Sequence, residues 1–191
     1  MAGSLLERVK AAPQRPEDGV SAGVDAWHRR SIRLPGYDYS QPGAYFVTIC
    51  VHGRRPILGD ISGGQLRISR YGEIVQACWD NLPSHYIHVE LDAFVVVPNH
   101  IHGIIRLTDA VGAGFKPAPT KRHALPEIVR AFKTFSARRI NAMRAAAGAP
   151  VWQRNYYEHV IRNDDELRVI RAYILNNPLG WDRDPENPSL A

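Results

Sequence analysis

The sequence predicts an α+β domain in which helices pack on an antiparallel sheet. Segments rich in β-branched and aromatic residues come in pairs, and segments with apolar residues at helical spacing lie between those pairs. This order is typical of an α+β sandwich. Hydrophobic residues make up 45% of the 191-residue chain, which is enough to form a core.

We expect strands at 45–51, 65–68, 88–97, 100–107 and 156–161, and helices at 71–82, 125–143 and from 163 or 164 to 176. Pro98 and Asn99 would join two strands through a hairpin or a bulged connection. Pro126 suits the first turn of a helix, and Pro178 would stop the last one. The apolar stripe predicted for 125–143 consists of Leu125, Ile128, Val129, Phe132, Phe135, Ile140 and Met143. Its opposite, polar face carries Arg130, Lys133, Arg138, Asn141 and Arg144.

The chain divides into a flexible N-terminal tail at 1–27, a domain at 28–180 and a C-terminal tail at 181–191. Within the domain, the Gly- and Pro-rich stretch at 108–124 is expected to be a flexible loop. Apolar runs are too short for a secretory signal or a membrane span. Two cysteines make no disulfide framework. We therefore expect a cytoplasmic protein with no membrane partner.

The positive charge of the chain is localised. The formal net charge is +5. The segment from Lys121 to Arg144 contains seven lysines and arginines and a single acidic residue, Glu127. A basic face of this kind indicates a polyanionic partner, although a solvated helix surface gives the same pattern. Charge alone leaves both interpretations open.

The His100-Ile-His102 triplet is a candidate metal site. Residues i and i+2 of a strand point to the same face, so two imidazoles ~7 Å apart along the strand can grip one ion while Ile101 is buried on the other side. Two polar strand residues facing solvent would give the same triplet, and such triplets are frequent by chance.

Tyr173 and Asn177 are four residues apart near the end of the last predicted helix, so they share a face. They can offer a phenol nucleophile and an amide ligand side by side, or simply a half-buried ring and a helix cap. The sequence contains no Walker loop, no dinucleotide fingerprint, no G-x-S-x-G motif and no cysteine pair at zinc spacing.

Four segments taken in order resemble the REP-associated tyrosine transposases, which are relatives of the single-tyrosine insertion-sequence transposases. They are residues 31–50 (SIRLPGYDYSQPGAYFVTIC), 96–104 (VVPNHIHGI), 152–159 (WQRNYYEH) and 173–178 (YILNNP). Together they extend over nearly the whole chain. The resemblance implies a ferredoxin-like fold with Tyr173 as the nucleophile and with His100, His102 and Asn177 as metal ligands. Related insertion-sequence enzymes usually carry Gln as the last ligand, and Asn177 is one methylene shorter.

Two tyrosines are rival nucleophiles and several basic residues are candidate DNA contacts. Tyr156 and Tyr157 point to opposite faces of a strand, so at most one of them can face the site. The residues expected to contact the DNA backbone are Arg29, Arg30, Arg33, Arg130, Lys133 and Arg138. Tyr37, Tyr39 and Trp152 are candidates for stacking on bases or for the core.

The expected function is metal-dependent cleavage and transfer of single-stranded DNA through a 5′-phosphotyrosine. Mg²⁺ or Mn²⁺ would orient the phosphate and neutralise its charge, and the resemblance implies hairpins of repetitive palindromes as the substrate. Alternatives are a non-catalytic single-stranded nucleic-acid-binding protein, a nuclease with a water nucleophile, and a domesticated relative. The sequence leaves monomer and homodimer open.

Overall fold

The computed structural model describes residue 34 and residues 36–62, 65–109 and 122–183. Its strands are β1 (Gly43–Cys50), β2 (Gly59–Ser62), β3 (Gln65–Ile68), β4 (Val89–Val97), β5 (His100–Leu107) and β6 (Tyr157–Ile161). Its helices are α2 (Arg70–Asp80), α3 (Leu82–His85), α4 (Leu125–Met143) and α5 (Asp164–Asn176). Two 3-10 turns, η1 (His52–Arg54) and η2 (Asn177–Arg183), complete the described elements. The predicted tail at 1–27 and most of the predicted loop at 108–124 lie outside the described residues.

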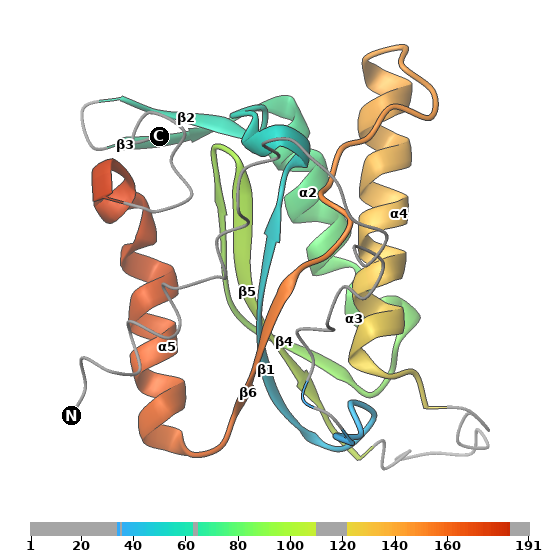
Figure 1. The fold of residues 1–191 in the computed structure, drawn as a ribbon, viewed down its shortest axis with the longest axis vertical. Coiled ribbons are helices and arrows are strands. Elements are labelled where there is room, and N and C mark those ends of the chain that lie inside the picture. The colour runs from blue at the N-terminus through green and yellow to red at the C-terminus, as the bar shows by residue number, and fades with distance from the viewer. Residues whose placement is uncertain (1–33, 35, 63–64, 110–121, 184–191) are drawn as a thin grey trace, which may run out of the picture.

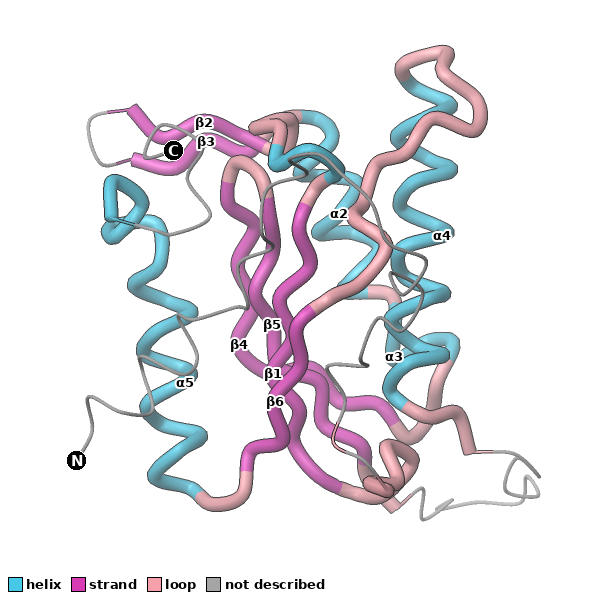
Figure 2. Tube along the Cα trace, viewed as in Figure 1, coloured by secondary structure: helices cyan, strands magenta, loops and turns pink. Residues whose placement is uncertain are grey.

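The main sheet has the strand order β4-β5-β1-β6, and every neighbouring pair is antiparallel. With α2 connecting β1 to β4 and α4 connecting β5 to β6, this is the ferredoxin-like arrangement that the family resemblance implied, and it confirms the α+β class that the sequence pattern predicted. Figure 2 shows the sheet between two helical layers, with α2 and α4 on one side and α5 on the other. β2 and β3 form a separate hairpin at one end of the sheet (Figure 1).

Each face of the sheet carries a cluster of buried apolar side chains, and the two clusters differ greatly in size. The larger cluster lies under α2 and α4 and includes Val47, Ile101, Trp79 and Phe132. The smaller cluster lies under α5, where Phe46 and Ile104 meet Ile170 and Ile174. Successive side chains of β1 and β5 thus point to opposite faces of the sheet, as the two-residue period of a strand requires.

Helix α5 begins at a well-formed cap. The Asn163 side chain accepts a hydrogen bond from the backbone N–H of Glu166, and three acidic residues occupy the first turn, where the helix dipole favours them. A Glu166 carboxylate oxygen also accepts from the backbone N–H of Arg162. These contacts fix where the helix starts, and therefore which residues face the sheet one to three turns later.

The burial pattern of α4 differs from the predicted stripe. Phe135 and Met143 are 52% and 51% exposed, whereas Ser136 and Asn141 are buried. Both buried polar side chains form hydrogen bonds to the segment that follows the helix. The Ser136 hydroxyl accepts from the Trp152 indole N–H, and the Asn141 amide donates to the Ala149 carbonyl. The sequence prediction placed Asn141 on the outer face, and it was wrong because this returning segment covers it. Among the described residues, no helix has the length and apolar character needed to cross a membrane.

Candidate active site

The two histidines of the triplet lie on the face of β5 that α5 covers. His100 and His102 are 0% and 3% exposed, and Ile101 between them is buried in the cluster on the other face. The Nε2 atoms of the two imidazoles approach to 2.9 Å. The strand therefore brings two imidazole nitrogens to one point, which is what the i, i+2 spacing predicts.

A buried amide orients the first imidazole. Asn99 donates from Nδ2 to the Arg54 carbonyl, and this contact turns its Oδ1 toward His100 Nδ1 at 2.8 Å. An amide oxygen only accepts, so His100 Nδ1 carries the proton of this hydrogen bond. In the neutral ring, Nε2 of His100 then presents its lone pair toward His102.

A buried hydroxyl holds the second imidazole. Thr48 pairs with His102 in the β1–β5 register, and its Oγ1 lies 2.8 Å from His102 Nδ1. A hydroxyl can donate or accept, so Thr48 can support either neutral tautomer of His102. Burial, and to a smaller extent His100, lowers the pKa of His102 well below its ordinary value. The neutral ring is therefore the stable form in the folded protein.

Tyr173 reaches this pair from α5. Its hydroxyl lies 3.3 Å from His102 Nε2, and its ring meets the His102 ring at a centroid distance of 5.1 Å. Phe46 stacks on His102 at 5.5 Å and packs edge-on against Tyr173 at 6.1 Å. These contacts place the phenol oxygen beside the imidazole nitrogens, although 71 residues separate the two groups in sequence.

Asn177 and Trp181 close the site from the C-terminal side. Asn177 is 5% exposed and keeps helical dihedral angles directly after α5, so it follows Tyr173 by one turn on the same side of the helix. Trp181 in η2 stacks on His100 at 6.2 Å. The described turn thus extends past the predicted domain boundary at 180, and sequence reasoning missed this aromatic contact because no pattern linked 181 to the triplet.

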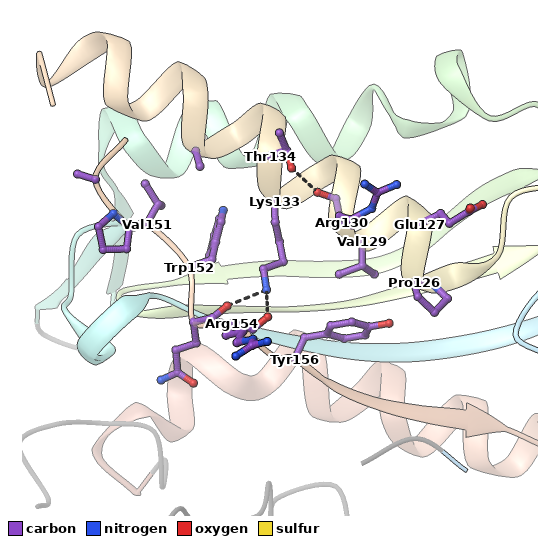
Figure 3. A pocket seen from close by; sticks show the side chains of 14 residues that line it. Pro126, Glu127, Val129, Arg130, Lys133, Thr134, Val151, Trp152, Arg154 and Tyr156 are labelled. Carbon is purple, nitrogen blue, oxygen red and sulfur yellow. Dashed lines mark hydrogen bonds between the residues drawn. The ribbon is translucent and has the colours of Figure 1, made fainter. Parts of the chain in front are cut away.

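Tyr156 and Tyr157, the two rival candidates for the nucleophile, lie on opposite faces of the sheet, as consecutive residues of an extended strand do. Tyr157 pairs with Thr48 and packs at 6.1 Å from Phe46, on the same face as the imidazoles. Tyr156 lies on the other face, in the lining of a cavity beside α4 (Figure 3). Burial raises the pKa of Tyr157, which makes its phenolate harder to form.

The predicted DNA contacts divide into three groups. Arg130 and Arg138 are exposed on α4. Lys133 is half-buried, and its ammonium donates to the carbonyls of Gln153, Arg154 and Asn155 at 2.7, 2.9 and 3.4 Å. Arg29, Arg30 and Arg33 lie outside the described residues. Of the candidate stacking residues, Tyr39 and Trp152 are each only 7% exposed and belong to the core.

The donor set at the triplet fits a divalent cation. Two nitrogen ligands bound at ~2.1 Å and at right angles to each other lie about 3 Å apart, and the imidazole nitrogens of His100 and His102 are 2.9 Å apart. Each Nδ1 has a supporting partner in Asn99 or Thr48, as ligating histidines usually do. In the described part of the chain no three His, Cys, Asp or Glu side chains gather at one point, so a third protein ligand here would have to be an amide or hydroxyl oxygen.

A ferredoxin-like sheet with paired imidazoles and a facing tyrosine indicates a protein of the transposase class. Comparison with known families agrees: the model of the IS200-like transposases matches residues 74–177, a region that contains the triplet, Tyr173 and Asn177. The chain belongs to the family of IS200-like transposases.

Two relatives and one solved structure are similar to this chain. An uncharacterized protein of Haemophilus influenzae is 39% identical over 86% of this chain and 94% of its own length. A second protein of that organism, described as a REP-associated tyrosine transposase, is 24% identical over 74% of this chain and 73% of its own. The structure of a REP-associated tyrosine transposase bound to a REP hairpin has a TM-score of 0.54 and 20% identity, with 78% of this chain and 73% of that chain covered. At this identity it supports the fold.

Proposed function

We propose that this transposase cuts and rejoins single-stranded DNA through a 5′-phosphotyrosine at Tyr173. The observation that carries the proposal is the 3.3 Å approach of the Tyr173 hydroxyl to His102 Nε2, itself 2.9 Å from His100 Nε2. A tyrosine hydroxyl beside two imidazole nitrogens can be activated as a nucleophile by a neighbouring base or by a metal ion that the nitrogens bind. The two groups come from one chain, so we propose that a single chain can hold a complete site.

In the proposed reaction the Tyr173 oxygen attacks the phosphorus of a backbone phosphodiester. The oxygen–phosphorus bond forms, the bond from phosphorus to the 3′ oxygen breaks, the phenol loses its proton and the leaving 3′ oxygen gains one. The phosphotyrosine keeps the energy of the original phosphodiester, so a free 3′-hydroxyl can reverse the step without ATP. Tyrosine with its ordinary pKa of ~10 is a poor nucleophile at neutral pH, so the site must assist this proton loss.

His100, His102 and Asn177 are the residues that would hold Mg²⁺ or Mn²⁺. Such an ion would orient the scissile phosphate and neutralise charge on its non-bridging oxygens. The lowered pKa of His102 keeps its ring neutral, as a ligand must be. Phe46 and Trp181 pack against the two rings, and this apolar packing limits their motion and keeps water away from them.

We propose hairpins of repetitive palindromic DNA as the substrate. The family membership and the solved relative with its REP hairpin support this choice. The exposed Arg130 and Arg138 of α4 are candidate contacts to the DNA backbone.

The test is incubation of the protein with end-labelled single-stranded hairpins and Mn²⁺, followed by a denaturing gel. We expect a shifted, protease-sensitive band that EDTA abolishes. Tyr173→Phe should lose the band and still bind DNA, while Tyr157→Phe, a matched loss of one hydroxyl on the same face, should keep it. Cleavage without an adduct would instead identify a water nucleophile, and binding without cleavage a non-catalytic DNA-binding protein.

A further inference from the structure

A cavity lies on the opposite side of the sheet from the imidazole pair. It measures about 660 Å³ and opens between α4 and the segment 149–156, which runs from α4 toward β6 (Figure 3). Since α5 and the two histidines are on the other face, the cavity shares no residue with the candidate active site. Its volume is within the range of pockets that take a small molecule or one nucleotide.

The inner wall of the cavity is aromatic and rigid. The Trp152 indole N–H donates to the buried Ser136 hydroxyl at 2.9 Å, and its ring packs against Phe132 at 5.9 Å. Tyr156 contributes a second, partly exposed ring, and Val129 and Ala137 add apolar surface from α4. Trp152 itself is only 7% exposed, so the Tyr156 ring is the flat surface that a planar ligand can reach, at little cost in side-chain entropy.

The rim of the cavity is positively charged. Arg130 of α4 and Arg154 of the facing segment are both exposed and line the opening from two sides (Figure 3). Lys133 lies between them, with its ammonium bonded to the carbonyls of residues 153–155. Burial lowers the pKa of Lys133 to about 8, so the group remains mostly protonated at pH 7. Glu127 is the acidic residue of the lining, and His123 pairs with it at 3.1 Å.

The contacts of Lys133 explain how the cavity keeps its shape. A single ammonium bonded to consecutive carbonyls holds the segment 153–155 at a set distance from α4, and that segment carries Arg154. Lys133 is therefore a positioning residue that sets the second wall. The two exposed arginines remain available for an anionic ligand.

We propose that this cavity is a second binding site for single-stranded DNA, which takes an unpaired base against the partly exposed ring of Tyr156 and the flanking phosphates at Arg130 and Arg154. Aromatic rings beside arginines are the usual means of holding single strands, because every base has a flat face and every nucleotide a phosphate. The inference extends the substrate binding of the proposed function. It depends on the handling of single-stranded DNA by this chain and does not depend on the phosphotyrosine.

The test compares two double variants with the same loss of charge. Arg130→Ala/Arg154→Ala removes the rim, while Arg139→Ala/Arg168→Ala removes two exposed arginines that do not line the cavity. Both are made in the Tyr173→Phe background, so that cleavage cannot disturb the binding measurement. The probe is a fluorescein-labelled ten-residue thymidine oligonucleotide, and its anisotropy gives Kd between 50 and 300 mM salt.

We expect the rim variant to bind at least tenfold more weakly and to lose about 1.4 from the slope of log Kd against log salt, at about 0.7 for each lost phosphate contact on a single strand. The control variant should stay within about threefold of the parent. An oligonucleotide with one 5-iodouracil should cross-link under light to Tyr156, as mass spectrometry of the peptides would show. Circular dichroism melts check that every variant folds.

An unchanged Kd and salt slope in the rim variant, or cross-links confined to residues of the α5 face, would overturn the proposal. Tighter binding of a matched duplex than of the single strand would also overturn it. A wild-type protein that binds through the rim but forms no covalent adduct would refute the proposed phosphotyrosine and leave the second site standing. A covalent adduct of the wild-type protein, together with unchanged DNA binding by the rim variant, would refute the second site and leave the proposed phosphotyrosine standing.

Discussion

Replacing Gly103 by alanine tests the packing that holds the histidine strand in place. Gly103 follows His102 in β5 and points to the opposite face, where a Cβ atom would lie 2.4 and 2.6 Å from two ring carbons of Trp79 and 2.9 Å from one of Phe94. Carbon atoms in contact are ordinarily 3.5–4.0 Å apart, so one of the groups must move by about 1 Å.

The Trp79 ring, the nearer of the two, has no free space around it. Trp79 is 1% exposed, stacks on Phe94 at 4.4 Å and meets Phe132 edge-on at 5.5 Å. Overpacking a tight core costs about 1–3 kcal/mol, and the upper half of that range applies because both neighbours are themselves packed. We expect Gly103→Ala to lower the free energy of unfolding by about 2–3 kcal/mol, measured by urea denaturation, and Tm by roughly 5–10 °C.

Two further variants make the measurement decisive. Gly43→Ala is a matched strand substitution whose Cβ meets atoms no closer than 3.6 Å, so it should change stability by less than about 0.5 kcal/mol. Trp79→Phe removes the ring carbons that clash, so the double variant with Gly103→Ala should lose at least about 1 kcal/mol less than the sum of the two single losses. Strict additivity, or a neutral Gly103→Ala, would refute the reasoning.

Two other substitutions test the groups around the site. Asp92→Asn should cost about 1 kcal/mol at pH 7, because Arg171 donates to both Asp92 oxygens at 2.7 and 2.5 Å in a half-exposed pair. Arg171 holds the pKa of the Asp92 carboxyl below its usual value. The difference in free energy of unfolding between wild type and Asp92→Asn should therefore be full above pH ~5 and shrink as pH falls below ~4. A difference that does not change between pH ~3 and ~7 in urea denaturation would contradict this reasoning. Thr48→Val should weaken Mn²⁺ binding by about 10- to 100-fold in calorimetry, because His102 loses its supporting hydroxyl, and unchanged affinity would exclude that role.

Local sequence patterns predicted most of the helices and strands, and the family resemblance supplied the ferredoxin-like topology. The bounds of β3, β5 and α4 agree with the predicted ranges, because β-branched runs, the Pro98–Asn99 break and the proline at the start of α4 are strong local signals. β2 was missed, since its four residues (GDIS) carry one large apolar side chain and pair only with β3 among the described strands.

The candidate site was less accessible to sequence reasoning. Strand and helix periods put His100 beside His102 and Tyr173 beside Asn177, and each pair depends on local geometry alone. The contact between the two pairs depends on the docking of α5 on the sheet, which no periodicity encodes, and the family resemblance supplied it. Thr48 was not identified because its role follows from the register between β1 and β5.

Strand register connects the two faces of this protein. Phe46, Thr48 and His102 face α5, while Val47, Ile49 and Ile101 enter the large core, so a one-residue slip of β5 against β1 would drive both imidazoles into apolar packing. The large core therefore specifies the site by fixing register from the opposite side of the sheet, which is why a glycine that faces Trp79 matters to a histidine pair that it does not touch.

The face under α5 is thinly covered by comparison, and this has a consequence for the nucleophile. Ile170 and Ile174 supply the buried apolar contacts of α5, and Arg171 between them pairs with Asp92 of β4. The position of Tyr173 relative to His102 therefore depends on a small set of contacts made one turn or less away on the same helix. Because the Arg171–Asp92 pair joins α5 to β4, Asp92→Asn should slow adduct formation more than its loss of stability alone would explain.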